Sequence, residues 1–312
     1  MTVRFSTRCP NSDYLGFETS PEAIVAAAKK AEEVGFDAIF VNDHIILDSS
    51  SRAAPWTNVY DPFVAMSFIA AHTTRIGVGV SVLIMPYRNP VATAKSLATI
   101  DRMSGGRLIA GVGAGWNEAE FAALGAFHER GARTNEYLRV WQACWAPGKV
   151  SFAGRFFSFS DMHVSPKPVQ QPHPPIWIGG ASDAALRRAA GFAAIWQPTP
   201  LPLAELVERQ TALHQACDQI GRLPIPTRMS FRVEISTVTG NALSSGGKRP
   251  VGYGTPAEVA SDLLIYREKA GLDAFQINFH GNRNLDQLLQ SMECFMRDVA
   301  PRVSGERTGS KN

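Results

Sequence analysis

An acidic side chain and an imidazole stand next to each other at Asp43 and His44, directly after the apolar run 37–42. An imidazole titrates near neutral pH, and a neighbouring carboxylate can orient it, which is what a proton-transfer partner requires. The same pair has a purely structural explanation, in which Asp43 caps a loop and His44 is a satisfied hydrogen-bonding residue. The pair therefore indicates a candidate proton-transfer site, with His44 as the candidate catalytic residue.

A second candidate site is the run Gly179, Gly180, Ala181 and Ser182, which precedes a helical pattern. Uncovered backbone N–H groups at a helix N-terminus bind anions, so a phosphate group is the ligand that this turn would favour. An ordinary glycine turn is the alternative. If the fold is a (β/α)8 barrel, a phosphate site at this turn would be unusual, because such barrels more often bind phosphate at the loops after strands seven and eight.

Two further segments are rich in glycine. The sequence GVGAGWNE places Gly115, Trp116 and Asn117 after an apolar run, and its glycine spacing differs from the G-x-G-x-x-G of dinucleotide-binding proteins. Gly77 and Gly79 remove side chains from one face of the segment 75–84. Such a bare face suits either tight strand packing or the close approach of a flat ligand.

Aromatic side chains stand in or beside the segments that follow apolar runs: Trp56, Tyr60, Trp116 and Trp196. They could line a pocket for a planar ring, or they could simply cover one end of the fold. His280 follows the last apolar run and is either a second site histidine or a loop residue. Trp56, Tyr60, Trp196 and His280 are the candidate substrate-binding residues.

The elements that must position these residues are short apolar runs alternating with longer stretches whose apolar residues recur every three or four positions. This alternation predicts parallel strands joined by helices. Eight strands are expected, at 3–9, 37–42, 75–84, 107–113, 175–179, 193–197, 228–237 and 274–279. Eight such units in 312 residues predict an α/β fold, a (β/α)8 barrel with loop insertions, and a doubly wound sheet is the alternative.

Helix starts and insertions complete this organisation. Four helices begin with a side-chain acceptor followed by proline, at 20–21, 61–62, 89–90 and 255–256. The extra length lies in loop insertions at 45–60, 149–174 and 240–254, none of which carries enough apolar residues for its own core. We expect a single domain over residues 1–303 and a disordered tail at 304–312. In a barrel, the candidate residues would gather at the carboxyl ends of the strands.

Composition excludes several classes of protein. The chain is 45% hydrophobic with a net charge of +3, too small and too evenly spread for a nucleic-acid or membrane-surface binder. No apolar run approaches the ~20 residues of a membrane span, and the first residues lack a signal peptide, so we expect a cytoplasmic protein. The four cysteines are scattered, and neither a metal site nor the nucleophile motif G-x-S-x-G is present in the sequence.

Four segments, at 35–45, 77–90, 105–125 and 165–190, resemble the luciferase-like monooxygenase superfamily: GFDAIFVNDHI, GVGVSVLIMPYRNP, GGRLIAGVGAGWNEAEFAALG and SPKPVQQPHPPIWIGGASDAALRRAA. In detail they are most similar to the branch that uses the deazaflavin coenzyme F420. The likeness covers nearly the whole chain and implies a flavin-binding (β/α)8 barrel.

The resemblance implies roles for the residues at the strand ends. His44 would lie near the reactive ring carbon as a proton partner or substrate-orienting group, and Asp43 would contact the ring. Ser81 and Val82 would form a cis peptide bond that backs the ring. The turn 179–182 would bind the cofactor phosphate, and the segment 115–117 would lie beside the ring.

The sequence departs from the family pattern at three places. Where the family's sugar-phosphate dehydrogenases carry a catalytic glutamate, this chain has the segment 115–117, which argues against sugar-phosphate oxidation. Ile84 stands where some deazaflavin enzymes have a threonine, and the segment 191–196 replaces a usual Gly-Asp-Gly-Trp.

These observations lead to the hypothesis of an F420-dependent oxidoreductase that transfers a hydride between the deazaflavin C5 and an organic small-molecule substrate. One alternative is an FMN-dependent monooxygenase that uses oxygen and reduced flavin from a separate reductase. Another is a non-catalytic flavin-binding protein. The family also implies a homodimer, and no nucleic-acid, membrane or metal partner is expected.

Overall fold

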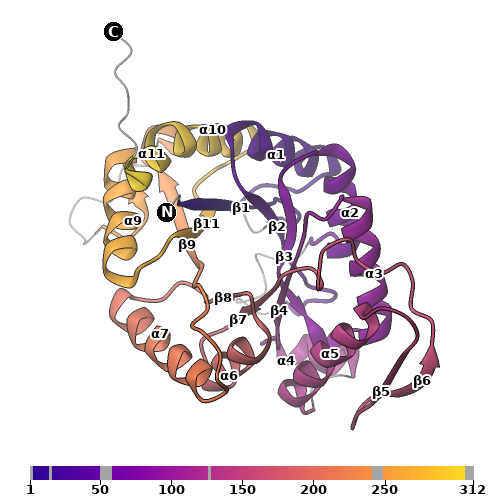
Figure 1. Ribbon diagram of the computed structural model, residues 1–312. Coiled ribbons are helices and arrows are strands. Elements are labelled where there is room, and N and C mark those ends of the chain that lie inside the picture. The colour runs from indigo at the N-terminus through magenta and orange to yellow at the C-terminus, as the bar shows by residue number, and fades with distance from the viewer. Residues whose placement is uncertain (1–2, 14–15, 50–57, 126–127, 241–248, 306–312) are drawn as a thin grey trace.

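The strands of the computed structural model run parallel to one another at the centre, and the helices lie around them (Figure 1). The structure describes residues 3–13, 16–49, 58–125, 128–240 and 249–305. Eight of the strands correspond to those expected: β1 (Arg4–Arg8), β2 (Ala38–Val41), β3 (Gly77–Ile84), β4 (Leu108–Gly113), β7 (Ile176–Gly179), β8 (Ile195–Gln197), β9 (Met229–Ile235) and β11 (Ala274–Phe279).

Hydrogen bonding closes these strands into a barrel. The sheet order is β9-β11-β1-β2-β3-β4-β7-β8, with the two-residue strand β10 (Tyr253–Gly254) added beside β9. Trp196 of β8 forms a parallel bridge with Thr227, just before β9, and the Trp196 carbonyl accepts a hydrogen bond from Arg228 N at 2.9 Å. The two ends of the order therefore meet, and the (β/α)8 prediction is confirmed.

A helix follows each barrel strand and packs outside it. The helices are α1 (Pro21–Val34), α2 (Pro62–His72), α3 (Pro90–Met103), α4 (Glu118–Leu124), α5 (Arg130–Trp145), α6 (Asp183–Phe192), α7 (Leu203–Asp218), α8 (Ser236–Thr239), α9 (Pro256–Ala270), α10 (Leu285–Cys294) and α11 (Ala300–Ser304). A short 3-10 turn (Met85–Tyr87) leads into α3, and a π-helical turn (Phe295–Val299) joins α10 to α11. No helix within the described ranges is long and apolar enough to cross a membrane.

The helix starts form as their sequences predict. Ser20, Asp61, Asn89 and Thr255 each accept a hydrogen bond from a backbone N–H of the first turn, and proline follows each of them. These bonds satisfy donors that the helix itself leaves without partners.

The structure differs from the expected elements at three places. The insertion 149–174 contains an antiparallel hairpin, β5 (Val150–Ala153) and β6 (Ser158–Met162), in which Phe152 and Phe159 stack at 6.1 Å. The strand expected at 228–237 ends at Ile235, because the next four residues form α8. Ser304 ends α11 and Gly305 caps it, and residues 306–312 of the expected tail lie outside the described residues.

The barrel interior explains one of the bare strand faces. Phe40 and Trp177 form a small apolar cluster apart from the main core, with ring centroids 5.0 Å apart. A Cβ at Gly79 would lie 2.5 Å from the Phe40 ring. Gly79 therefore allows tight strand packing, which was one of the two explanations for the bare face of this segment. The other was the close approach of a flat ligand.

Candidate functional site

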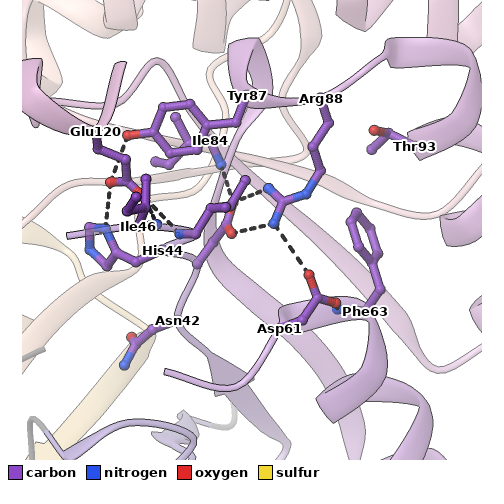
Figure 2. A network of polar contacts seen from close by, with 12 residues as sticks. Asn42, His44, Ile46, Asp61, Phe63, Ile84, Tyr87, Arg88, Thr93 and Glu120 are labelled. Carbon is purple, nitrogen blue, oxygen red and sulfur yellow. Dashed lines mark hydrogen bonds and ion pairs between the residues drawn. The ribbon is translucent and has the colours of Figure 1, made fainter. Parts of the chain in front are cut away.

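His44 and Glu120 meet at the carboxyl end of the barrel (Figure 2). His44 follows β2 and Glu120 lies in the first turn of α4, after β4. The His44 Nδ1 atom is 2.8 Å from Glu120 Oε2, the Glu120 side chain has no exposed surface, and the His44 side chain is 8% exposed. A carboxylate only accepts hydrogen bonds, so the Nδ1 atom carries the proton in this pair.

Three further donors hold the Glu120 carboxylate in place. Its Oε1 atom accepts hydrogen bonds from the backbone N–H of Ile45 at 2.7 Å and of Ile46 at 3.3 Å. The Tyr87 hydroxyl donates to Oε2 at 2.8 Å. Burial raises the pKa of Glu120, but the hydrogen bonds from His44 and Ile45 outweigh burial and hold this pKa below its usual range. The carboxylate is therefore charged and fixed, and it orients the imidazole.

Asp43 makes an ion pair with Arg88 instead of pairing with its neighbour His44. Both Asp43 oxygens lie 2.7 Å from a guanidinium nitrogen, and the Ile84 N–H donates to the same carboxylate at 2.8 Å. Burial lowers the pKa of Arg88, but the hydrogen bonds and charge of Asp43 outweigh burial and raise it. Asp43 thus ties the end of β2 to the start of α3.

Val82 forms a platform at the same end of the barrel. The peptide bond between Ser81 and Val82 is cis, as the resemblance implied. A Cβ at Gly113 would lie 2.5 Å from Val82 Cγ2, and one at Gly179 would lie 2.9 Å from Val82 Cγ1. The half-buried Val82 side chain therefore lies over two glycines of neighbouring strands, and a larger residue at either glycine would displace it.

Gln197 presents a polar atom beside this platform. Its Nε2 atom donates to Ser81 Oγ at 3.2 Å and also to Gln276. The residue is 3% exposed, and among the described residues its Oε1 atom has no hydrogen-bond partner. A buried acceptor of this kind is costly without a donor. The pyrimidinedione N–H shared by flavins and deazaflavins is a donor of suitable chemistry, so the residues present fit such a ring.

The glycine turn at 179–182 leads into α6. Gly180 has a φ of +93°, and Ser182 caps the helix by accepting from Ala185 N. The indole N–H of Trp196 donates to the Gly180 carbonyl at 2.7 Å. This bond fixes the turn with its residues 180–182 at the amino end of α6, where an anion would be stabilised.

The segment 115–117 places one aromatic ring beside His44 and builds the start of α4. Trp116 is 39% exposed, and its ring lies edge-to-face with His44 at 6.0 Å. Asn117 caps α4 by accepting from Glu120 N at 3.2 Å, and its amide donates to Asp48 at 3.0 Å. Gly115 has a φ of +77°, and a Cβ there would lie 2.7 Å from the Phe121 ring. This segment therefore also positions Glu120.

The three described residues that were expected to bind substrate have different surroundings. Trp196 is fully buried in the main core, which corrects the expectation that its ring lines an open pocket. The half-buried Tyr60 packs against the same core, its backbone N–H donates to the Asn11 carbonyl, and its carbonyl accepts from the Asn11 side-chain amide. His280 stands at the end of β11, where its N–H donates to the Val233 carbonyl at 2.8 Å. Trp56 lies outside the described residues.

The sequence interpretation missed Glu120, Tyr87 and Arg88. Glu120 stands three residues after Asn117, the spacing of a cap followed by an acidic residue at a helix start. Tyr87 and Arg88 lie in the MPYRNP segment directly after β3. The sequence showed that these residues follow a strand. It did not show which groups they would pair with.

Comparison with known proteins identifies the family. The family model for luciferase-like monooxygenases matches residues 1–242. The chain is 30% identical over 258 residues to an uncharacterised protein of Mycobacterium tuberculosis, covering 78% of this chain and 91% of that protein. Among solved structures, a monooxygenase from Streptomyces bottropensis has the same fold, with a TM-score of 0.80 and 22% identity over 96% of this chain and 99% of that one.

Relatives with assigned activities use two different cofactors. An F420-dependent glucose-6-phosphate dehydrogenase of Amycolatopsis mediterranei is 34% identical over 177 residues, 55% of this chain and 52% of that enzyme. An FMNH2-dependent dimethylsulfone monooxygenase of Pseudomonas putida is 37% identical over 132 residues, 41% of this chain and 36% of that enzyme. Given the match of the family model over residues 1–242 and the barrel that carries it, this chain belongs to the luciferase-like monooxygenase family of flavin- and deazaflavin-dependent oxidoreductases.

Proposed function

We propose that this protein is an F420-dependent oxidoreductase that transfers a hydride between the deazaflavin C5 and an organic small molecule. The observation that supports this most is the buried His44–Glu120 pair, joined at 2.8 Å and held by three more hydrogen bonds to the carboxylate. Hydride transfer to or from a carbon that bears oxygen requires a proton at that oxygen, and an oriented imidazole is suited to exchange it.

The residues that would hold the cofactor are those of the platform and the turn. Val82 would support one face of the ring, Gln197 Oε1 would accept its N–H, and the amino end of α6 at residues 180–182 would take the phosphate. The bound deazaflavin supplies a carbon that accepts or donates a hydride, and the protein supplies binding and orientation. Trp116 would exclude water from one side of His44.

His44 would move one proton through its Nε2 atom. Because Glu120 holds the proton on Nδ1, Nε2 is the ring nitrogen that would take a proton from a substrate hydroxyl as it becomes a carbonyl. In the opposite direction the imidazolium would return that proton, and the Glu120 carboxylate would stabilise its charge. Asp43 would have only a positioning role, because its ion pair with Arg88 would fix the end of β2.

An FMN-dependent monooxygenase is the second candidate, because the dimethylsulfone enzyme is 37% identical over 132 residues. Fluorescence titration of the purified protein with F420 and with FMN compares the two directly. Micromolar binding of F420 with FMN at least tenfold weaker would support hydride transfer. Preferential FMN binding, with substrate-dependent oxygen consumption in the presence of a reductase, would refute it. Binding without turnover in either assay would leave a flavin-binding protein.

The homodimer stays a prediction. Val64 and Phe68 of α2 are 68% and 38% exposed, so this helix presents an apolar face. Sedimentation of the wild type beside a Val64→Glu variant would test whether α2 contributes to self-association.

A further inference from the structure

Two arginines and an amide stand in one row on the barrel interior. Thr7 pairs with Ile277, and Asn278 pairs with Arg232, so Arg8, Asn278 and Arg232 occupy the same level of β1, β11 and β9. These three strands are adjacent in the sheet. We call Arg8, Asn278 and Arg232 the arginine row.

Alternation along the strands points the row inward. Phe231 and Val233, on either side of Arg232, are buried in the main core between the strands and the helices. Ile277 and Phe279 flank Asn278 in the same way. Because successive side chains of a strand point to opposite faces, Arg232 and Asn278 point into the barrel. Arg8, which precedes the core residue Cys9, does so as well.

The two guanidinium groups act on the same place. Neighbouring strands are ~5 Å apart, so the backbones at Arg8 and Arg232 are about 10 Å apart, a separation that two long side chains can span. His280 stands one level higher on β11. Burial, together with the charges of Arg232 and Arg8, lowers the pKa of His280 to about 4. His280 is therefore neutral near pH 7, and both arginine charges reach it.

The charge in this region favours a monoanion. Within the described part of the chain, no carboxylate lies within 4.0 Å of the Arg232 guanidinium. Glu234, one level above, accepts a hydrogen bond from Thr239 at 3.3 Å, and a Cβ at Gly281 would lie 2.7 Å from its Oε1 atom. The formal charges of Arg8, Arg232 and Glu234 add up to one positive charge.

The arginine row lies opposite the residues proposed for the cofactor. In the closed order, β9, β11 and β1 stand across the barrel from β3, β4 and β7, which carry the platform and the glycine turn (Figure 1). A ring on Val82 with its phosphate at α6 would leave the arginine row facing the second reactant. His44 follows β2, the strand next to β1, so it stands between the two halves.

We propose that the arginine row binds a carboxylate of the substrate, so that the enzyme acts on an organic acid. The assignment of the row to the substrate rests on the proposed function. A planar carboxylate matches the paired N–H donors of a guanidinium, and the Asn278 amide supplies a further donor between the two arginines. One net positive charge matches a monoanionic carboxylate better than a phosphate dianion.

The substrate is not known, so the carboxylate preference of the arginine row is tested with small acids, each compared with its neutral amide. The probes are acetate, hexanoate and benzoate, each compared with its neutral amide, added to the purified protein with and without F420 and followed by calorimetry and thermal unfolding. We expect at least one acid to bind at least tenfold more tightly than its amide. Arg232→Gln and Arg8→Gln should each weaken that acid at least tenfold, while Arg139→Gln, an exposed arginine of α5, should leave it unchanged. Arg232→Lys, which keeps the charge and loses the paired donors, should give an intermediate loss.

Three results would overturn the proposal. Equal binding of every acid and its amide would remove the carboxylate preference. Wild-type acid binding in both glutamine variants would remove the row from the site. A tenfold or greater loss of F420 affinity in Arg232→Gln, with acid binding retained, would assign the arginine to the cofactor. Acid binding that depends on Arg232 in a protein that binds neither F420 nor FMN would refute the proposed function and leave the carboxylate site standing.

Discussion

Replacing Glu120 by glutamine tests whether this carboxylate controls the protonation of His44. The two side chains have nearly the same volume, so the packing of α4 is kept. Oε1 serves the Ile45 and Ile46 N–H groups, whereas Oε2 serves His44 and Tyr87. In Glu120→Gln the remaining oxygen can stay with the backbone, and an NH2 group then faces the imidazole at the Oε2 position.

The magnitude follows from the tautomer. An NH2 group facing Nδ1 requires a lone pair there, so the imidazole proton moves to Nε2, which can no longer accept a proton from the substrate. An Asp→Asn change that inverts the tautomer of a protease histidine costs about 10⁴ in kcat. We therefore expect kcat to fall by roughly 10²–10⁴-fold, with less than about a threefold change in F420 affinity, because Glu120 does not belong to the platform or the turn.

Stability should change in a pH-dependent way. Hydrogen bonds to charged groups contribute about 1.5–3 kcal/mol each, so the loss of two at Oε2 should lower the unfolding free energy by about 2–4 kcal/mol at pH 7 once the replacement contacts are counted. The folded-state pKa of Glu120 is lowered, so its contribution is present above the ordinary glutamate pKa of about 4.3 and is lost as pH falls through the folded value. The difference between wild type and variant should therefore shrink below about pH 4.

The assay combines single-turnover kinetics, urea denaturation and ¹⁵N NMR of the His44 ring, which distinguishes a proton on Nδ1 from one on Nε2. Glu118→Gln is the matched control, because Glu118 is an exposed residue in the first turn of the same helix. A kcat within threefold of wild type, or an unchanged ring tautomer, would refute the reasoning.

The remaining predictions concern the residues around this pair. Arg88→Met leaves the Asp43 carboxylate buried without its bidentate partner, so urea denaturation should show a loss of about 3–5 kcal/mol, and adding Asp43→Asn should recover at least half of it; no recovery would contradict an ion-pair origin. Gly113→Ala places a methyl group 2.5 Å from Val82 Cγ2 and should weaken F420 or FMN binding at least tenfold in fluorescence titration, at a stability cost of about 1–3 kcal/mol; unchanged affinity would remove Val82 from the ring site. Trp196→Phe removes the hydrogen bond to the turn carbonyl and should weaken the complete cofactor several-fold while leaving the chromophore without its phosphate unaffected; equal losses for both would argue against a phosphate site at the turn.

The resemblance predicted one feature of the backbone that no periodicity could indicate. The cis bond between Ser81 and Val82 came from the likeness to the family, and the bond is present in the structure. The surroundings of this bond could be known only from the folded structure. Only the meeting of β3, β4 and β7 shows that Val82 lies over Gly113 and Gly179.

Sequence spacing by itself determined the elements and their order. Apolar periodicity and the proline-containing caps act within a few residues, so the eight strands, the helices and the barrel could be predicted. Their positions also placed the candidate residues at strand ends. The burial of Trp196 was not predicted, because in a three-residue strand with every position buried the sequence carries no alternation to show which side chain faces the helices.

Tertiary structure alone decided which polar groups pair. Asp43 and His44 are neighbours in sequence, yet Asp43 pairs with Arg88, 45 residues away, and His44 pairs with Glu120, 76 residues away. These groups come together because β2, β3 and β4 lie side by side in the sheet. A buried carboxylate must find a donor wherever the packed strands provide one, and that choice depends on distances between strands that no local pattern contains.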